Sequence, residues 1–82
     1  MNKKQKAKKF ADYLIWYRVD NHLSRKEFAS KLLITEPTLK RWETGKANMS
    51  RHSDKVRRAW ILIAYELEFK LLQITKELGD AE

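Results

Sequence analysis

The sequence predicts a small all-α domain of four to five helices that ends in a long C-terminal helical segment. Over most of the 82 residues, apolar side chains recur every three to four positions, which is the spacing of one helix face. Residues that favour helix starts precede these stretches, and the one proline and two glycines fall near their ends. A chain of this length forms one domain, which we assign to residues 10–82.

Residues 1–9 are predicted to form a flexible basic arm. They contain five lysines and no acidic residue, and they show no helical spacing of apolar side chains. The segment is either a solubilising tail or an arm that contacts phosphate through Lys3 and Lys4. We favour the arm because it adjoins the motif described below.

The first helix is predicted over residues 7–20. Phe10, Leu14 and Tyr17 fall on one face of this helix and are expected to be buried. Residues 21–22, Asn-His, are expected to end it.

The second helix is predicted over residues 24–33. Ser24 can cap its N-terminus, and Glu27, three positions later, completes a capping box. Four apolar residues then form one stripe, which we expect to be buried: Phe28, Ala29, Leu32 and Leu33.

The third helix follows a short turn. Thr35 is the predicted N-cap, Glu36 suits the positive first turn, and Pro37 stands where its missing N–H has no cost. Gly45 is expected to end the helix in a left-handed conformation. Residues 24–45 therefore predict a helix-turn-helix.

The two sides of the third helix differ in chemistry. At about 100° per residue, Leu39 and Trp42 share one side and are predicted to lie in the core. The opposite side is bulky, polar and basic: Pro37, Lys40, Arg41 and Thr44, with Glu36 and Thr38 at its edges. A short helix with such an outward face meets the requirements for binding in the DNA major groove.

These residues resemble the phage-repressor and Cro type of helix-turn-helix domain, also called the xenobiotic-response-element type. The similarity spans residues 10–50, and its most specific part is the Arg-Trp-Glu-x-Gly-Lys run at 41–46. The matching positions are Leu23-Ser24, Glu27-Phe28-Ala29, Leu32, Ile34-Thr35, Thr38-Leu39, Arg41-Trp42-Glu43, Gly45-Lys46 and Ser50. The chain departs from the family where it has Leu33 in place of a glycine and Met49 in place of a frequent proline.

The resemblance implies a lambda-repressor-like fold that binds double-stranded DNA. It also implies an ion pair between Arg18 and Glu43 that locks the first helix to the third, although both could instead be ordinary surface charges. Arg25 stands where the family contacts phosphate or the first base, and its fork suits phosphate oxygens.

We assign DNA contacts by side-chain chemistry. Arg41 could bind guanine in a bidentate way, Glu36 could accept a hydrogen bond from cytosine, and Pro37 or the Thr38 methyl could touch thymine. For Glu36 and Thr38 the alternative is helix capping. The predicted phosphate contacts, besides Lys3 and Lys4, are Arg25, Lys40, Thr44, Lys46, Asn48 and Arg51.

The last element is predicted over residues 53–78. An unbroken helix of this length would be about 39 Å long, more than a compact domain with a radius of gyration near 12 Å could cover. Val56, Trp60, Ile63 and Leu67 can close the core. The remaining apolar residues imply a partner, which we predict to be a second copy: Tyr65, Phe69, Leu72, Ile74 and Leu78, with Ile61 and Leu71. The alternative is a break at residues 66–68 that gives two helices packed on the same core.

Charge and composition narrow the function. A net charge of +7 and a pI near 9.8 point to a polyanionic partner. There is no cysteine, and the two histidines form no ligand set, so we expect no metal or cofactor. No nucleophile and base or phosphate loop can be assembled, so we expect no enzyme. The longest apolar run, residues 59–65, is too short for a membrane span, so we expect a cytoplasmic, nucleoid-associated protein.

The sequence as a whole predicts a dimeric repressor of bacterial or phage type that binds an inverted-repeat operator. Repression is favoured over activation because occlusion of a promoter needs only binding. Two alternatives stay open: an antitoxin-like or adaptor protein whose C-terminal helix holds a protein partner, and a non-specific nucleic-acid packaging protein.

Overall fold

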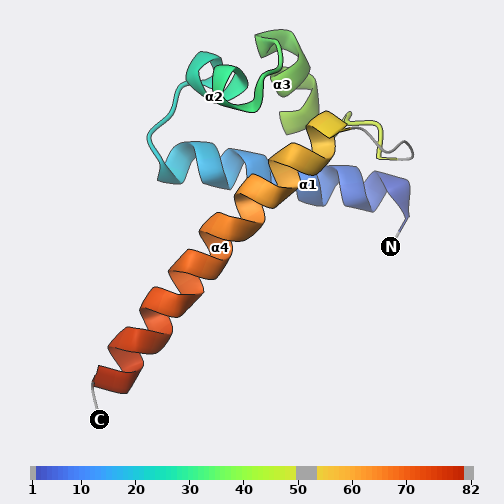
Figure 1. Ribbon diagram of the computed structural model, residues 1–82. Helices are drawn as coiled ribbons and strands as arrows, with labels where there is room; N and C mark the ends of the chain where they lie inside the picture. The colour runs from blue at the N-terminus through green and yellow to red at the C-terminus, as the bar shows by residue number, and fades with distance from the viewer. Residues whose placement is uncertain (1, 50–53, 81–82) are drawn as a thin grey trace.

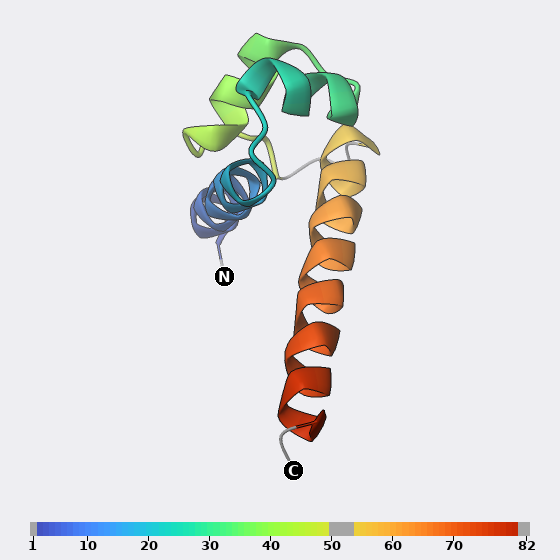
Figure 2. The same cartoon turned by 90° about the vertical axis from the view of Figure 1, so that its left-hand side faces the viewer.

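The computed structural model describes residues 2–49 and 54–80 of the chain. Within these residues it contains four α-helices and no strand: α1 (Lys3–Asp20), α2 (Arg25–Leu32), α3 (Glu36–Glu43) and α4 (Asp54–Asp80). Helices α2 and α3 lie on one side of α1, and α4 crosses α1 and then extends away from the other helices (Figures 1 and 2). The predicted all-α fold is therefore confirmed.

Helix α1 begins earlier than the sequence analysis predicted. The Asn2 side chain accepts a hydrogen bond from the Gln5 N–H at 2.8 Å, and the Gln5 side chain accepts one from the Asn2 N–H at 3.1 Å. This capping box starts the helix at Lys3, and Ala7 is buried. The prediction of a flexible arm over residues 1–9 is thus wrong for residues 3–9, because lysine, glutamine and alanine are good helix formers even without an apolar stripe.

Helix α2 starts at the predicted capping box. The Glu27 N–H donates to Ser24 Oγ at 3.0 Å, and the Ser24 N–H donates to Glu27 Oε1 at 2.9 Å. The hydrogen bond from the Ser24 backbone lowers the pKa of the exposed Glu27 carboxyl, and the Ser24 side chain lowers it by a smaller amount. The charged form of Glu27 therefore completes the cap.

Leu33 does not belong to the buried stripe of α2, contrary to the prediction. It follows the helix in the left-handed conformation, with φ 59° and ψ 41°, and is 70% exposed. This conformation lets the Ile34 N–H reach the Ala29 carbonyl at 3.0 Å, as in a Schellman motif. Because the chain reverses at Leu33, its side chain points away from the face that carries Phe28 and Leu32.

Helix α3 is bounded as predicted. The Thr38 N–H donates to the Thr35 side chain at 3.3 Å, and Pro37 occupies the first turn. At the other end Gly45 has φ +80°, and the Lys46 N–H donates to the Arg41 carbonyl at 3.0 Å. A Cβ on Gly45 would lie 4.0 Å from the Cα of α1 residue Lys8, so the turn also sits close to α1.

The core lies where α1 meets the other three helices. Phe10 of α1 is fully buried, with its ring centroid 5.4 Å from that of Trp42 and 5.1 Å from that of Trp60. Tyr17 stacks on Phe28 at 5.1 Å. The buried cluster comprises Phe10, Leu14, Tyr17, Phe28, Ala29, Leu32, Leu39, Trp42, Ala47, Val56, Ala59 and Ile63. It includes the residues predicted to be buried in α1 and α3, and Trp60 and Leu67 of α4 pack against it half-buried.

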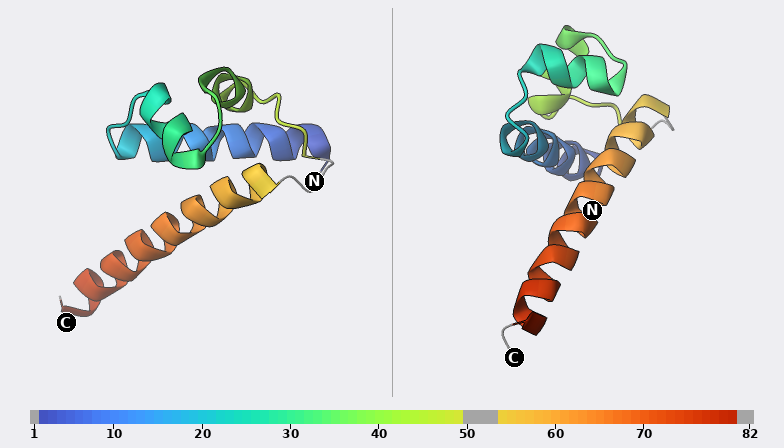
Figure 3. Two further views of the ribbon diagram at one scale, coloured as in Figure 1. Left: turned by 45° about the horizontal axis from the view of Figure 1, so that its top comes forward. Right: turned by 60° about the vertical axis from the view of Figure 1, so that its left-hand side comes forward.

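Helix α4 is continuous from Asp54 to Asp80, so the alternative of a break at residues 66–68 is wrong. No glycine or proline interrupts it before Gly79. The C-terminal half projects beyond α1 in every view, including those of Figure 3, and the radius of gyration of 14.4 Å exceeds the roughly 12 Å of a compact domain. The predicted start of this element at residue 53 lies outside the described residues.

Two polar contacts fix the direction of α4. Arg58 Nη1 donates to the Leu32 carbonyl at 3.2 Å, at the C-terminal end of α2, where a positive charge is favourable. Lys70 Nζ lies 2.8 Å from Asp20 Oδ2 at the end of α1, and this hydrogen bond raises the pKa of Lys70. The helix is therefore held at two points that are twelve residues apart.

Replacing Leu33 with glycine should stabilise the domain. Glycine adopts φ 59° without the penalty of a β-carbon, and the exposed leucine contributes little packing. We expect a gain of about 1 kcal/mol, which corresponds to about 4–8 °C in Tm for a domain of this size, measured by thermal unfolding.

Lys9→Gly is the control, since it places glycine at an exposed position inside α1. It should lower stability by about 0.5–1 kcal/mol. A lower Tm for Leu33→Gly would show that Leu33 makes stabilising contacts that outweigh its backbone conformation.

Candidate nucleic-acid interface

The outward side of α3 presents polar and basic side chains to solvent. Glu36, Pro37, Lys40 and Arg41 are exposed, and Thr38 is half-buried. A shallow hollow at the N-terminal end of α3 is lined by Arg25, Glu36, Pro37 and Lys40. Three predicted contacts on α3 and one on α2 therefore surround one concave surface.

Two of the threonines in the predicted interface are already engaged. Thr38 Oγ1 is hydrogen-bonded to Thr35 Oγ1 at 2.8 Å, so it belongs to the N-terminal cap. Thr44 Oγ1 donates to the Arg41 carbonyl at 2.9 Å, with the Lys40 carbonyl at 3.1 Å. The single proton of Thr44 is thus directed at the end of α3 in the absence of DNA, and the phosphate contact predicted for this exposed residue stays a prediction.

The inward side of α3 fixes the helix to α1. Leu39 is fully buried and Trp42 is nearly so, with the Trp42 ring against that of Phe10. The prediction that Leu39 and Trp42 are core residues agrees with this burial. Because α3 has only eight residues, this packing determines which of its side chains face outward.

A buried carboxylate joins α1, α2 and α3. Arg18 Nε lies 2.8 Å from Glu43 Oε2, and Arg18 Nη2 lies 3.1 Å from Glu43 Oε1. Arg25 Nε and Nη2 both lie 3.3 Å from Glu43 Oε1. The Glu43 side chain is only 2% exposed, so the ion pair that the resemblance implies is present and includes a third member.

The role of Arg25 was only partly anticipated. Its guanidinium pairs with Glu43, while its side chain remains 37% exposed beside Glu36 and Lys40. The sequence separation of Arg25 and Glu43 does not indicate that they touch, because their contact results from the packing of α2 against α3.

A second basic hollow lies at the C-terminal end of α3. It is lined by Lys4, Gln5 and Lys8 of α1, together with Thr44 and Gly45. The helical start of α1 therefore places Lys4, a predicted phosphate contact, beside α3. Sequence analysis missed Lys8, since only the close approach of Gly45 to α1 brings it there.

The remaining predicted contacts follow α3. Lys46 and Asn48 are exposed, and Ala47 between them is buried against the core. Lys3 is exposed in the first turn of α1. Arg51 lies outside the described residues.

The helix-turn-helix family model matches residues 14–51. This segment is a helix-turn-helix domain of the phage-repressor and Cro type. Searches of curated proteins and of solved structures gave no match. The match to this DNA-binding family points to a DNA-binding transcription regulator.

The matched residues include the C-terminal part of α1 from residue 14 onward, all of α2 and α3, and none of the described part of α4. Among the residues that the structure describes, no three histidine, aspartate or glutamate side chains gather to hold a metal ion. No helix within 2–49 or 54–80 is long and apolar enough to cross a membrane.

The residues predicted to form a dimer interface are exposed on α4. Tyr65, Phe69, Leu72, Ile74 and Leu78 are each more than half exposed. At about 100° per residue, Tyr65, Phe69 and Leu72 lie on one side of the helix, whereas Ile74 and Leu78 continue the side that faces α1. The structure thus divides the predicted set into two surfaces.

Removing the Glu43 charge should destabilise the helix-turn-helix domain strongly. Glu43→Gln leaves two arginines without their common partner, and we expect a loss of about 3 kcal/mol in urea unfolding. Arg18→Gln should cost less because Arg25 still pairs with Glu43. The variant that carries both Arg18→Gln and Glu43→Gln should lose less stability than the two single variants together, by at least about 1 kcal/mol.

Glu77→Gln, at an exposed position of α4, is the control and should change stability by less than about 0.5 kcal/mol. Additive losses at Arg18 and Glu43 would show that the two side chains do not stabilise each other.

Proposed function

We propose that the protein is a sequence-specific transcriptional repressor of bacterial or phage type, which binds an inverted-repeat operator as a homodimer. The observation that carries this proposal is the orientation of α3. Buried Leu39 and Trp42 hold one side against α1, and the Glu43 carboxylate ties the end of α3 to two arginines. The exposed side is therefore held rigidly, as base recognition requires.

Base contacts are assigned to four residues of α3. The exposed Arg41 guanidinium suits bidentate binding to guanine, and Glu36 can accept a hydrogen bond from cytosine. Pro37 offers an apolar surface for a thymine methyl group. Thr38 contributes through its methyl group, because its hydroxyl is hydrogen-bonded to Thr35.

Phosphate contacts are assigned to the two hollows beside α3 and to the loop after it. Arg25 and Lys40 lie at the N-terminal hollow, and Lys4 lies at the C-terminal hollow, with Lys3 in the same turn of α1. Lys46 and Asn48 follow α3 along the chain, and Arg51 extends the same basic segment. Lysine and arginine at the two ends of α3 would orient the helix on the duplex.

Repression is the regulatory outcome that requires least beyond binding. A protein that covers an operator blocks polymerase without a further contact surface, whereas activation needs such a surface. The protein would act on the nucleoid in the cytoplasm.

A second candidate function is supported by α4. The exposed apolar side chains of α4 could hold a different protein, as in an antitoxin or adaptor. Co-purification of a stoichiometric second polypeptide with the protein expressed in its native host would favour this function over a self-contained repressor.

Selection of bound duplexes from a random pool tests the proposed function. At about 0.15 M salt, binding to phosphate alone is weak, so enrichment reports recognition of bases. We expect an inverted repeat with half-sites about one helical turn apart. Equal recovery of all sequences would indicate non-specific packaging instead.

Two substitutions then separate base contacts from phosphate contacts. Arg41→Gln should weaken binding to the selected site by about 1–3 kcal/mol and relax the preference at one base pair. Lys46→Gln is the matched control, since it should weaken binding to all sequences alike and reduce the salt slope by about one. If Arg41→Gln kept the wild-type preference at every base pair of the site, Arg41 would have no part in base recognition.

A further inference from the structure

Helix α4 carries an apolar stripe on the side turned away from α1. Leu62, Tyr65, Phe69 and Leu72 follow one another at intervals of three, four and three residues. This is the spacing of the a and d positions of a coiled coil. Leu62 is half-buried at the base of the stripe, and the other three side chains are more than half exposed. We call these four residues the outer stripe.

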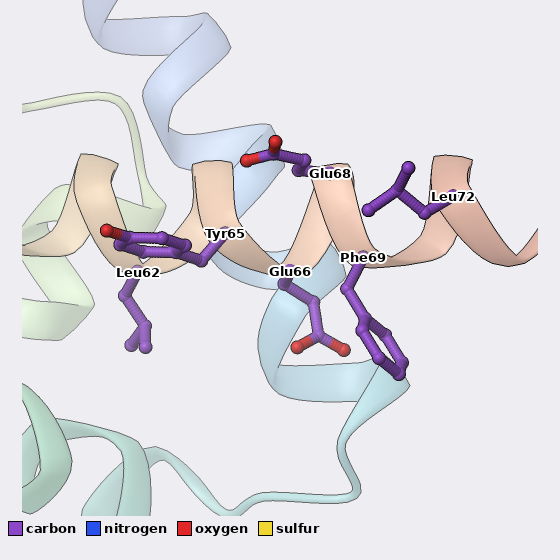
Figure 4. Close-up of a pocket in the computed structure, with 6 residues that line it drawn as sticks. All are labelled: Leu62, Tyr65, Glu66, Glu68, Phe69 and Leu72. Carbon is purple, nitrogen blue, oxygen red and sulfur yellow. The ribbon is translucent and has the colours of Figure 1, made fainter.

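The outer stripe borders a shallow groove. The groove is lined by the four stripe residues together with Glu66 and Glu68, and Figure 4 shows all six side chains on α4 with α1 behind it. Val56, Ala59 and Ile63, the buried residues of α4, lie about 130° away around the helix axis. Leu62 also packs against the edge of the core, so a second helix would have its freest access to the outer stripe from Tyr65 to Leu72.

We propose that two copies of this chain associate by parallel pairing of their α4 helices along the outer stripe. Each stripe residue would meet its equivalent in the second copy, so Phe69 would pack against Phe69 and Leu72 against Leu72. The direction of pairing rests in part on the proposed function, because an inverted repeat requires both α3 helices to face one DNA duplex.

The charges beside the stripe favour the parallel direction. In an antiparallel pair centred on residue 67, Leu62 would face Leu72 and Tyr65 would face Phe69. In that arrangement Glu66 would flank Glu66 of the other copy on one side of the seam, and Glu68 would flank Glu68 on the other, which places like charges together near the centre. In the parallel pair, coiled-coil geometry places Glu68 beside Gln73 of the second copy and Glu66 beside its Ile61.

The ends of the stripe are compatible with parallel pairing. Arg58 and Lys76 continue the same spacing at either end and would approach their equivalents. The Arg58 guanidinium is turned aside toward the Leu32 carbonyl, at 3.2 Å. Lys76 is exposed, and its long stem can carry the charge outward into water.

The position of α3 is the observation that links the parallel direction to the proposed function. Helices α2 and α3 lie near the N-terminal end of α4, opposite its free C-terminal end (Figure 1). Parallel pairing would place both α3 helices at the same end of the dimer. Antiparallel pairing would place them at opposite ends of a shaft about 40 Å long, since α4 has 27 residues.

Sedimentation of the full chain without DNA tests the choice of surface. Phe69→Glu should raise the dissociation constant of the dimer at least about a hundredfold, because two carboxylates would meet across the two-fold axis. Leu71→Glu is the matched control: Leu71 is 63% exposed on the same helix but lies outside the stripe, so the dimer should persist. Circular dichroism verifies that both variants are folded. A monomeric wild type, or dissociation by Leu71→Glu alone, would overturn the proposal.

Single cysteines test the direction, because the chain has none of its own. In the parallel pair two Leu72→Cys side chains face each other and should oxidise to a disulfide-linked dimer. In the antiparallel pair about residue 67 they would be about 15 Å apart along the axis and stay reduced. Leu71→Cys is the control and should not cross-link. If the protein is a dimer and only Leu71→Cys cross-links, pairing along the outer stripe is contradicted. If the protein is a dimer and neither variant cross-links, the parallel direction is contradicted.

These measurements stand apart from the selection of DNA sites. A wild type that dimerises and cross-links through Leu72→Cys but selects no sequence would refute the repressor function and leave the pairing intact. A wild type that selects an inverted repeat as a dimer, but whose dimer persists in Phe69→Glu, would refute the pairing along the outer stripe and leave the repressor function intact.

Discussion

The orientation of α3 depends on one buried carboxylate. Glu43 is the last residue of α3, and its side chain accepts hydrogen bonds from Arg18 of α1 and Arg25 of α2. Apolar contacts of Leu39 and Trp42 supply burial but little directionality. The three-way ion pair adds direction, since a bidentate arginine fork fits a carboxylate in one plane. An eight-residue helix with few intrinsic restraints is thereby fixed against two others.

The same arrangement would connect the structural role of Arg25 with the phosphate contact proposed for it. Arg25 touches Glu43 on one side and borders the hollow with Glu36 and Lys40 on the other. A phosphate bound at this hollow would meet a guanidinium already positioned by the protein, which lowers the entropy lost on binding. At the far end of α3, the Gly45 turn rests on α1 and brings Lys4 and Lys8 alongside. Both ends of the exposed α3 face are therefore basic, while its middle remains available to bases.

Helix α4 extends the domain beyond the residues that the family model covers. Its first half completes the core, and Arg58 and Lys70 fix its direction relative to α2 and α1. Beyond Lys70 it extends away from the other described helices, although its apolar side chains continue (Figure 1). A helix that is apolar on more than one side becomes buried by association. The proposed pairing would use the outer stripe for this purpose and leave α3 free to contact DNA.

The sequence by itself determined the local structure: the capping box at Ser24, the cap at Thr35, the left-handed Gly45 and the inward side of α3 all follow from interactions within a few residues. The start of α1 is also local, but it depends on the Asn2–Gln5 capping box, which apolar spacing does not reveal. Only the tertiary structure decided that Arg25 joins Glu43, that Lys8 lies beside α3 and that Arg58 caps α2. Each of these contacts joins residues far apart in the chain, and their proximity depends on how the helices pack. The division of the α4 surface into two sides has the same origin, because burial against α1 distinguishes one apolar stripe from the other.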